Sequence, residues 1–221
     1  GDVEVQDEGS QLLALMVDAK RGEMVVDFCA GAGGKTLALG AAMRNTGRLY
    51  AFDTSGHRLA ALKPRLARSG LSNVYPVQIA HERDDRIKRL AGKIDRVLVD
   101  APCSGLGTLR RNPDMKWRQT PDAVEELRVK QAAILASAAR LLKPGGRLVY
   151  ATCSPLGVEN EAIADAFTEA NRATFRPLAA DEVLVAAHVE GAQALVRHGF
   201  LRLWPHRHGT DGFFAAVWQR S

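Results

Sequence analysis

The stretch Met24–Thr36 reads MVVDFCAGAGGKT and is the starting point for the architecture. Its apolar first half predicts a short buried strand that ends near Cys29, and a helix is expected from about Gly34 to Arg44. The glycines in between allow a tight turn and a close approach of the backbone to a ligand. A strand, a glycine turn and a helix in this order are typical of a doubly wound α/β fold, which binds ligands at the carboxyl ends of its strands.

Apolar runs alternate with helical periodicity on both sides of this stretch, which predicts a mostly parallel, seven-stranded sheet flanked by helices. The further strands are expected at Arg48–Asp53, Val74–Ile79, Asp95–Asp100, Arg147–Cys153, Phe200–Trp204 and Phe213–Gln219. Helices are expected at Ser10–Ala19, before Gly70 with a late start or a kink at Pro64, at Pro121–Leu142 and from about Val158. The run KPGG at 143–146 is typical of a helix stop, and the turn-rich PHRHGTDG at 205–212 predicts a terminal antiparallel hairpin.

The composition limits the class of protein. The 221 residues are 46% hydrophobic and 25% charged, which is enough for a sizeable core. No apolar run is long enough for a membrane span, and the amino terminus lacks the pattern of a signal peptide. The three cysteines fit neither a disulfide framework nor a zinc site, so we expect a cytoplasmic protein with no metal and no membrane partner. No repeat or linker divides the chain, which predicts a single domain over residues 1–221, with a monomer as the simplest state.

Three kinds of ligand site use a glycine turn between a strand and a helix. A Walker phosphate loop requires glycine where Cys29 stands, and a nicotinamide fingerprint requires glycine where Thr36 stands. The remaining alternative is the glycine loop of an S-adenosylmethionine (SAM) site. Asp53 ends the next predicted strand about 20 residues further on, where doubly wound folds place an acid that binds ribose hydroxyls.

Two cysteines follow two different predicted strands. Cys103 comes shortly after Asp100, and Cys153 ends the strand that follows the long helix. If these strands are neighbours, two thiols and a carboxylate share one rim of the sheet. A single cysteine is usually a small buried hydrophobe, which remains the preferred interpretation of Cys29, although Cys29 also suits the wall of a cofactor loop.

Methyl transfer to carbon 5 of a pyrimidine requires such a set of groups. Carbon 5 becomes nucleophilic only after a thiolate has added to carbon 6, and an acid near ring nitrogen 3 neutralises the charge that develops there. A second group then helps to eliminate the first thiol. Because a free thiol has a pKa of about 8.5, the nucleophile needs cationic help, and Lys35 is the nearest candidate.

Six segments, taken together, resemble the RsmB/Sun-like (NSUN) family of SAM-dependent RNA cytosine-5 methyltransferases over essentially all 221 residues. They are VQDEGSQ, CAGAGGKT, Asp53, DAPCSGLGTLRRNPDMKW, ATCSPLGVENE and GTDGFFAA. The segment RRNPDMKW is most similar to the corresponding segment of the bacterial enzyme that methylates small-subunit ribosomal RNA. The resemblance implies a Rossmann-like class I methyltransferase domain, SAM as cofactor and ribosomal RNA as substrate. It also implies the catalytic part of a longer chain, because bacterial relatives often carry an N-terminal RNA-binding region.

The resemblance also assigns roles residue by residue. Cys153 matches the nucleophile, Cys103 the cysteine that assists product release, Asp100 the acid that contacts the cytosine, and Lys35 a lysine that faces the target base. The matching cofactor site comprises Cys29, Ala30, Gly31, Ala32, Gly33, Gly34, Lys35, Asp53, Arg58 and Asp100.

This sequence departs from the family pattern at two places. Gly31 and Ala32 stand where the family commonly has Ala-Pro, which loosens the loop. After the third strand, Ala80 stands where the family usually presents an aspartate near the adenine. Either Glu82 or Asp84 substitutes for that acid, or the contact is missing.

The chain carries 30 Lys and Arg against 25 Asp and Glu, a net charge of +5 that favours polyanionic partners. The segment LRRNPDMKWR at 109–118 concentrates cations just beyond Cys103, so RNA phosphate contact is expected there, and Trp117 is suited either to stacking on a base or to packing within the loop. The expected RNA-binding residues are Arg110, Arg111, Lys116, Trp117 and Arg118.

Three rival functions follow from the same residues. An RNA-binding or ribosome-assembly factor that has lost turnover would explain the missing acid at Ala80, but the intact pair of cysteines argues against it. A DNA cytosine-5 methyltransferase would rely on Cys103 in place of Cys153. An NAD-dependent oxidoreductase would need a hydride-transfer partner that the sequence does not offer.

Overall fold

A computed structural model describes residues 1 and 3–221, so residue 2 of the predicted domain lies outside the described residues. The strands are β1 Met24–Asp27, β2 Arg48–Asp53, β3 Val74–Gln78, β4 Ile94–Asp100, β5 Leu142–Thr152, β6 Phe175–Leu178, β7 Val196–Arg197, β8 Phe200–Arg202 and β9 Phe214–Arg220. The α-helices are α1 Glu8–Val17, α2 Gly34–Ala42, α3 Gly56–Ser69, α4 Asp85–Lys88, α5 Pro121–Ala139, α6 Glu161–Ala170, α7 Ala180–Ala186 and α8 Pro205–His208. Short 3-10 turns are η1 Leu106–Thr108, η2 Pro113–Trp117 and η3 Ala192–Leu195.

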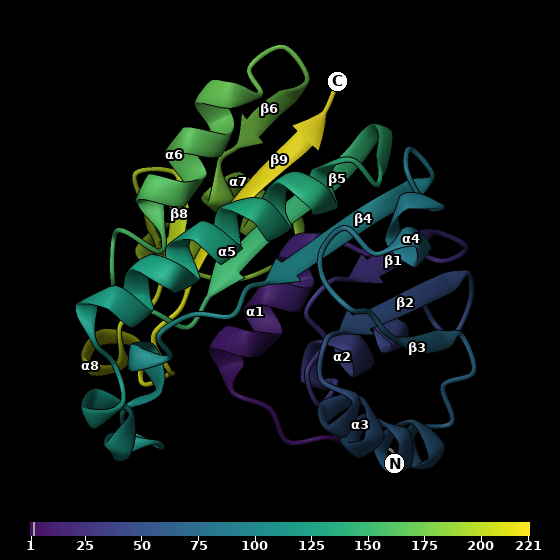
Figure 1. Cartoon of the computed structure of the whole chain (residues 1–221), viewed down its shortest axis with the longest axis horizontal. Helices are drawn as coiled ribbons and strands as arrows, with labels where there is room; N and C mark the ends of the chain where they lie inside the picture. Colours follow the sequence, from purple (N-terminus) through teal and green to yellow (C-terminus); the bar gives the residue numbers. More distant parts are fainter. Residues whose placement is uncertain (2) are drawn as a thin grey trace.

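All the strands join one mixed sheet in the order β3-β2-β1-β4-β5-β9-β8-β7, with β6 also paired to β9 (Figure 1). The strands from β3 to β5 are parallel, whereas β9 runs antiparallel to β5 and to β8. The strand order reverses direction between β1 and β4, and this switch point is where open α/β sheets bind ligands. The α/β prediction and the terminal hairpin are confirmed.

The predicted count of seven strands is wrong for the part of the chain that the structure describes. The additional strands are β6, which pairs with β9, and β7, which pairs with β8. They span four and two residues, so neither is long enough to show the alternation by which strands are recognised. Because both join the antiparallel half, the sheet is less dominated by parallel pairs than expected.

The KPGG run does not stop a helix. Helix α5 ends at Ala139, and Lys143–Gly146 lies within β5, where the register against β4 shifts between Ile94 and Arg96. Gly145 has a φ of 78°, which glycine adopts without the penalty that a Cβ brings. The two glycines therefore accommodate an irregularity of the strand. Helix α3 likewise runs through Pro64 from Gly56 to Ser69, so it does not start late.

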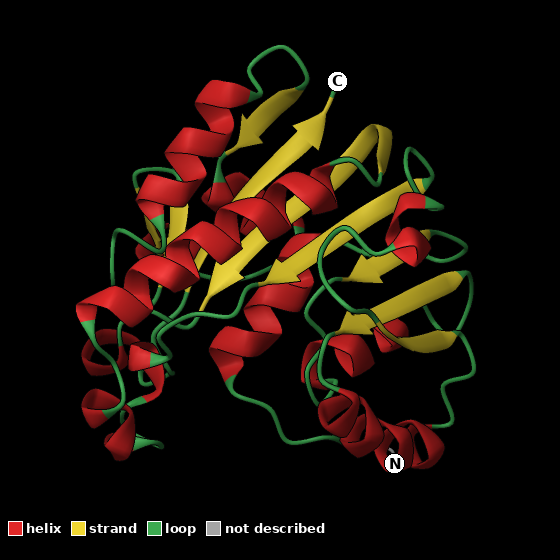
Figure 2. Ribbon diagram, in the orientation of Figure 1, coloured by secondary structure: helices red, strands yellow, loops and turns green. Residues whose placement is uncertain are grey.

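Helices cover both faces of the sheet (Figure 2), and the sheet divides the core into two layers. On one face, Met16 of α1 and Leu62 of α3 pack against strand residues such as Leu98, and all three are fully buried. On the other face, Leu135 of α5 and Phe167 of α6 pack against residues that point the opposite way. The neighbours Leu98 and Val99 in β4 belong to different layers, because successive side chains of a strand face opposite sides. This double covering leaves the strand ends as the accessible part of the sheet.

Candidate active site

The glycine loop between β1 and α2 is shaped by two residues with positive φ. Gly31 has a φ of 57° and Gly33 a φ of 87°, a region that other residues rarely adopt. A Cβ on Gly33 would lie 2.1 Å from Leu62 Cδ1, so this position has neither the conformation nor the space for a side chain. The loop places backbone N–H groups at the start of α2, towards the carboxyl end of β1.

Asp53 ends β2 and holds this loop. Its Oδ2 accepts a hydrogen bond from Gly31 N at 2.8 Å, and its Oδ1 accepts one from Ser55 N at 2.7 Å. The residue is 6% exposed and lines the cavity beside the loop. Each carboxylate oxygen keeps a further lone pair, so a ribose hydroxyl donor can also be accommodated.

Asp27, at the end of β1, is a site residue that sequence analysis missed. It is 1% exposed, and its Oδ2 accepts a hydrogen bond from Thr36 Oγ1 at 2.7 Å. Its Oδ1 has no hydrogen-bond partner among the described residues. Burial raises the pKa of this carboxyl to about 7, against the smaller opposing effect of Thr36. The only sequence signal is an acid inside an otherwise apolar strand.

The two predicted cysteines meet at the ends of β4 and β5. Cys103 Sγ and Cys153 Sγ are 3.4 Å apart, within hydrogen-bond reach for sulfur. The hydrogen bond to Cys153 and burial raise the pKa of Cys103 well above its usual range, so Cys103 holds its proton. The prediction that neighbouring strands bring these thiols to one rim is therefore confirmed.

Three loops meet behind this pair of cysteines. Gly107 N donates to Cys153 O at 2.8 Å, and Gly212 N donates to Gly107 O at 2.8 Å. A Cβ on Gly107 would lie 2.7 Å from Cys153 O and 2.2 Å from Gly212 O, which requires glycine at this crossing. The loop after β4 is thus fixed against both the end of β5 and the segment before β9.

Lys35 and Asp100 form an ion pair at the same rim. Lys35 Nζ lies 2.7 Å from Asp100 Oδ2, and the side chains are 13% and 27% exposed. Burial acts to lower the pKa of Lys35, but Asp100 outweighs it and the pKa is raised, with Cys153 contributing in the same direction. Lys35 is therefore a persistent cation at the rim that also carries Cys153.

A single open cavity of about 1000 Å³ connects the glycine loop with the cysteines. Among the predicted residues it is lined by Cys29, Ala30, Gly31, Ala32, Gly33, Gly34, Lys35, Asp53, Arg58, Asp100, Cys103 and Cys153. Cys29 also packs against the core, as its interpretation as a small hydrophobe predicts. The cavity is the size of a nucleoside cofactor with room for a base beside it.

The structure distinguishes the two acids offered as substitutes at Ala80. Asp84 accepts hydrogen bonds from Ala80 N and Arg86 N, at 2.9 Å each, and caps helix α4. These bonds lower the pKa of Asp84. Asp84 is thereby committed to the local turn, whereas Glu82 lines the cavity.

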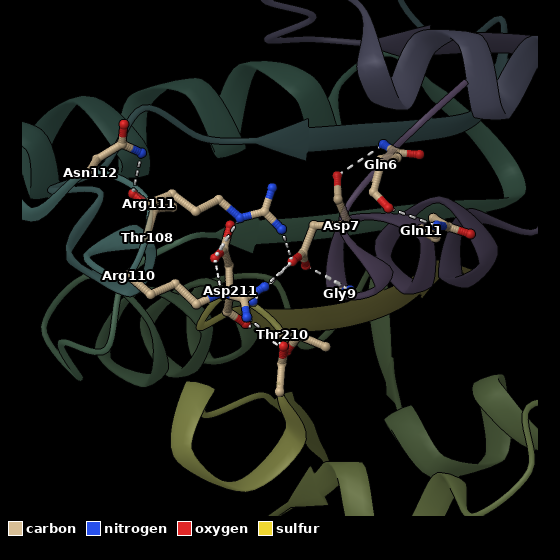
Figure 3. A network of polar contacts seen from close by, with 12 residues as sticks. Gln6, Asp7, Gly9, Gln11, Thr108, Arg110, Arg111, Asn112, Thr210 and Asp211 are labelled. Atoms are coloured by element: carbon tan, nitrogen blue, oxygen red, sulfur yellow. Dashed lines mark hydrogen bonds and ion pairs between the residues drawn. The ribbon is translucent and has the colours of Figure 1, made fainter. Parts of the chain in front are cut away.

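Two of the five predicted RNA-binding residues, Arg110 and Arg111, share a pair of nearly buried carboxylates (Figure 3). Asp7 Oδ2 lies 3.0 Å from Arg110 Nη2 and 2.6 Å from Arg111 Nη2. Asp211 Oδ1 lies 2.8 Å from Arg110 Nε and 3.2 Å from Arg111 Nε. Both aspartates are nearly buried, so this cluster joins the basic loop to the segments before α1 and before β9. Nearby carboxylates therefore balance the charges of Arg110 and Arg111, whose contact with RNA phosphate stays a prediction.

The other three predicted RNA-binding residues are exposed on the surface of the basic loop; they are Lys116, Trp117 and Arg118. Trp117 is 81% exposed, and Lys116 Nζ lies 4.9 Å from the centroid of its ring. Arg118 pairs with Asp114 at 2.6 Å on the exposed surface. The alternative that Trp117 packs within its loop is excluded by this exposure.

Comparison with known proteins agrees with this geometry. The model of the 16S rRNA methyltransferase RsmB/F family matches residues 14–219. The chain belongs to this RsmB/F family. SAM, predicted from the glycine loop, is the cofactor of such methyltransferases, and the positive-φ glycines, Asp53 and the size of the cavity fit it.

Several relatives of this RsmB/F family member are similar over nearly all of its length. A Bacillus subtilis protein named "Probable ribosomal RNA small subunit methyltransferase B" is 38% identical over 215 residues, 97% of this chain and 47% of the relative. Ribosomal RNA small subunit methyltransferase F of Escherichia coli is 34% identical over 216 residues, 96% of this chain and 43% of the relative. The chain thus spans about half the length of these relatives.

Solved structures show the same fold. NSun6 from Pyrococcus horikoshii with SFG superposes with a TM-score of 0.80 at 27% identity, covering 97% of this chain and 52% of that one. A methyltransferase homologue from Pyrococcus horikoshii has a TM-score of 0.78 at 30% identity, covering 99% and 68%.

Two further findings concern metals and membranes. Within residues 1 and 3–221, no group of three or more histidine, cysteine or acidic side chains is arranged to hold a metal ion. Over the same residues, none of the helices is both long and apolar enough to cross a membrane.

Proposed function

We propose that this RsmB/F family member methylates carbon 5 of cytosine in RNA, with small-subunit ribosomal RNA as the substrate, through a covalent bond between Cys153 and the base. The observation that carries the proposal is the Cys103–Cys153 pair, 3.4 Å apart, at a cavity that also holds the Lys35–Asp100 ion pair. The names of the relatives in Bacillus subtilis and Escherichia coli support ribosomal RNA as the substrate class.

The first step assigns the nucleophile to Cys153. Its thiolate forms a bond to carbon 6, and the electron pair of the 5,6 double bond moves to carbon 5. Two neighbours are assigned to activate Cys153: the Lys35 cation at the same rim, and the Cys103 thiol, whose sulfur lies 3.4 Å from Cys153 Sγ.

The second role belongs to the Lys35–Asp100 pair. Negative charge develops on ring nitrogen 3 as Cys153 adds, and the cation of Lys35, held in place by its ion pair with Asp100, stabilises that charge at the rim of the cavity. Because Lys35 and Asp100 come from α2 and β4, the orientation of the pair is set by the packing of α2 on the sheet.

Bound SAM supplies an electrophilic methyl group. The residues that would hold it are Asp53 for the ribose, the backbone of Gly31–Gly34, and Glu82 on the adenine side. Arg58 also lines this part of the cavity.

Release of the product reverses the first bond. The proton on carbon 5 leaves to water, the electron pair restores the 5,6 double bond, and the bond from carbon 6 to Cys153 Sγ breaks. Cys103, which keeps its proton, donates a hydrogen bond to the departing thiolate. Loss of Cys103 therefore leaves the addition intact and slows the elimination.

RNA contact is assigned to the outer part of the basic loop. Trp117 and Lys116 are exposed beyond the cavity, suited to stacking on an unpaired base and to a phosphate. Arg118 adds a cation that is partly balanced by Asp114. A base within a duplex would have to be flipped out of its stack to reach Cys153.

Covalent trapping tests this function. Cys103→Ala and Cys153→Ala are incubated with SAM and small-subunit ribosomal RNA and compared on a denaturing gel with the unaltered chain. Cys103→Ala is expected to accumulate an RNA–protein adduct, whereas Cys153→Ala forms none. An adduct with Cys153→Ala alone would exchange the cysteine roles and favour DNA as substrate. If Cys103→Ala forms no adduct and the unaltered chain binds RNA without methylating it, the assembly-factor alternative is favoured.

A further inference from the structure

Glu159, between β5 and α6, is a fully buried carboxylate that the mechanism above does not use. Its Oε1 accepts hydrogen bonds from Ser104 N at 2.9 Å and Gln131 Nε2 at 3.0 Å. Its Oε2 accepts from Ser104 Oγ at 2.6 Å and from Ser154 Oγ. Four donors thus converge on one side chain.

These donors come from both cysteine loops. Ser104 directly follows Cys103, and Ser154 directly follows Cys153. The carboxylate therefore joins, at one residue's distance from each sulfur, two loops that leave neighbouring strands. Gln131 of α5 adds a third element, because the same Nε2 also donates to Pro102 O at 2.9 Å.

The backbone around Glu159 is fixed independently of its side chain. Tyr150 Oη donates to Glu159 O at 2.6 Å, and Asn160 Nδ2 donates to Ser154 O at 2.8 Å. Thr152 Oγ1 also contacts Asn160 Oδ1. The carboxylate is thus presented from a rigid frame, which lets it define the positions of Ser104 and Ser154.

Burying the Glu159 carboxylate costs free energy that its hydrogen bonds have to offset. Within the described residues, Glu159 has hydrogen bonds to neutral groups but no ion pair, so its charge is stabilised by dipoles alone. A buried charge is expensive unless every lone pair is used, and an apolar residue would leave several buried donors unpaired. The arrangement suits a carboxylate whose purpose is to hold four donors at once.

We propose that Glu159 is a positioning residue that sets the Cys103–Cys153 separation by holding Ser104 and Ser154. The proposal rests on the proposed function for its role in methyl transfer, but the separation of the sulfurs is measurable without that reaction. The negative charge of Glu159 also adds to the hydrogen bond and burial that raise the pKa of Cys103. Glu159 thereby helps Cys103 to keep the proton that assists release.

A trivalent arsenical measures the sulfur separation directly. Phenylarsine oxide condenses with two nearby thiols: two As–S bonds form, and both thiol protons leave with the oxygen as water, without oxidation or reduction. A pair of sulfurs 3.4 Å apart is preorganised for this ring, so capture should withstand an excess of a monothiol. The unaltered chain is expected to bind one arsenical, and Cys103→Ala and Cys153→Ala should lose it.

The variants compare removal of the carboxylate with its replacement by an amide. Glu159→Ala is expected to weaken arsenical capture at least about tenfold, because chelation depends on the two loops being held together. Glu159→Gln should remain within about threefold of the unaltered chain: its oxygen accepts from Ser104 N and Gln131, while its amide donates to the two serine hydroxyls. Ser154→Ala, which removes one donor of the four, should fall between these two variants.

Two controls separate positioning from loss of structure. Asn73→Ala removes another buried polar side chain, which precedes the edge strand β3 and whose Nδ2 donates to Thr46 O at 2.9 Å. It should lower the thermal midpoint and leave arsenical capture unchanged. SAM affinity, measured by calorimetry, should be retained in every Glu159 variant, because Glu159 does not line the cofactor cavity.

Three results would overturn the proposal. They are capture by Glu159→Ala equal to that of the unaltered chain, loss of capture in Asn73→Ala, or failure of Glu159→Gln to restore capture. If Glu159→Ala does not fold, Ser154→Ala carries the test. If the unaltered chain captures the arsenical but methylates no cytosine, the proposed function fails while the positioning result stands.

Discussion

Each side of the cavity is held by hydrogen bonds, and these join residues at different separations along the sequence on the two sides. On the cofactor side, Gly31 is hydrogen-bonded to Asp53, 22 residues away in the sequence, and Thr36 is hydrogen-bonded to Asp27, 9 residues away. On the cysteine side, Cys103 meets Cys153 across 50 residues, and Ser104 meets Glu159 across 55. The first side uses glycine conformation and adjacent strand ends, whereas the second uses a buried polar cluster.

Because different residues hold the two sides, we expect that each side can be perturbed separately. A change in the glycine loop should weaken cofactor binding and leave the sulfur separation intact. A change behind the cysteines should do the reverse. The first prediction measures both sides, so a change in SAM affinity there would show that they are coupled. The next two perturb the cofactor side, and the last concerns the basic loop.

The largest effect is expected for Cys153→Ala. Removal of the nucleophile should lower the rate of methyl transfer by a factor of about 10⁴ or more, since carbon 5 then has no route to activation. SAM affinity should stay within about twofold, because the sulfur lies on the opposite side of the cavity from Asp53. Single-turnover transfer of labelled methyl groups and calorimetry measure the two quantities. A rate that survives would contradict the assignment of Cys153.

Gly33→Ala should destabilise the cofactor side by about 2–4 kcal/mol, because the methyl group meets Leu62 at 2.1 Å and the φ of 87° disfavours it. Gly31→Ala is the matched control, since its φ is 57° but nothing lies within 4 Å of the added carbon. It should lose only about 1 kcal/mol. Urea unfolding measures both, and equal losses would remove the role assigned to Leu62.

Asp27→Asn should change how stability depends on pH. Burial raises the pKa of Asp27 to about 7 in the folded state, against 3.8 for an unperturbed aspartate, so between these values the folded state holds a proton that the unfolded chain has released. The free energy of unfolding contributed by Asp27 therefore falls as pH rises through this window.

Relative to the asparagine variant, the unaltered chain should lose about 2 kcal/mol between pH 5 and pH 7. Urea unfolding of both proteins at several pH values measures the difference. Parallel stability curves would show that the carboxyl of Asp27 titrates in its ordinary range.

The smallest effect concerns the basic loop. Lys116→Ala should reduce the slope of log affinity against log salt for RNA by about 0.7–0.9, as expected for one released counterion. Arg111→Ala should change the slope less, because Asp7 and Asp211 already balance its charge. Filter binding over a range of salt concentrations compares them. A larger change for Arg111→Ala would restore it as a phosphate ligand.

Most of the architecture and the lining of the cavity were predictable from local patterns. The strand Arg48–Asp53 was placed to the residue, and Asp53 was assigned to the cofactor site because doubly wound folds place an acid at the end of that strand. Convergence of Cys103 and Cys153 was predicted because neighbouring parallel strands end at a common edge of the sheet. β6 and β7 were missed because strands this short have no periodicity to detect.

The amino-acid sequence alone specified the strand–turn–helix units, the glycine loop and the two cysteines at strand ends, because these depend on neighbours along the chain. The fold specified which charges are neutralised: it pairs Arg110 and Arg111 with Asp7 and Asp211, and it buries Glu159 among donors from both cysteine loops. It also placed the KPGG run inside β5 by pairing that strand with β4. The physical reason is that burial and long-range pairing are collective properties, which no local pattern of residue types encodes.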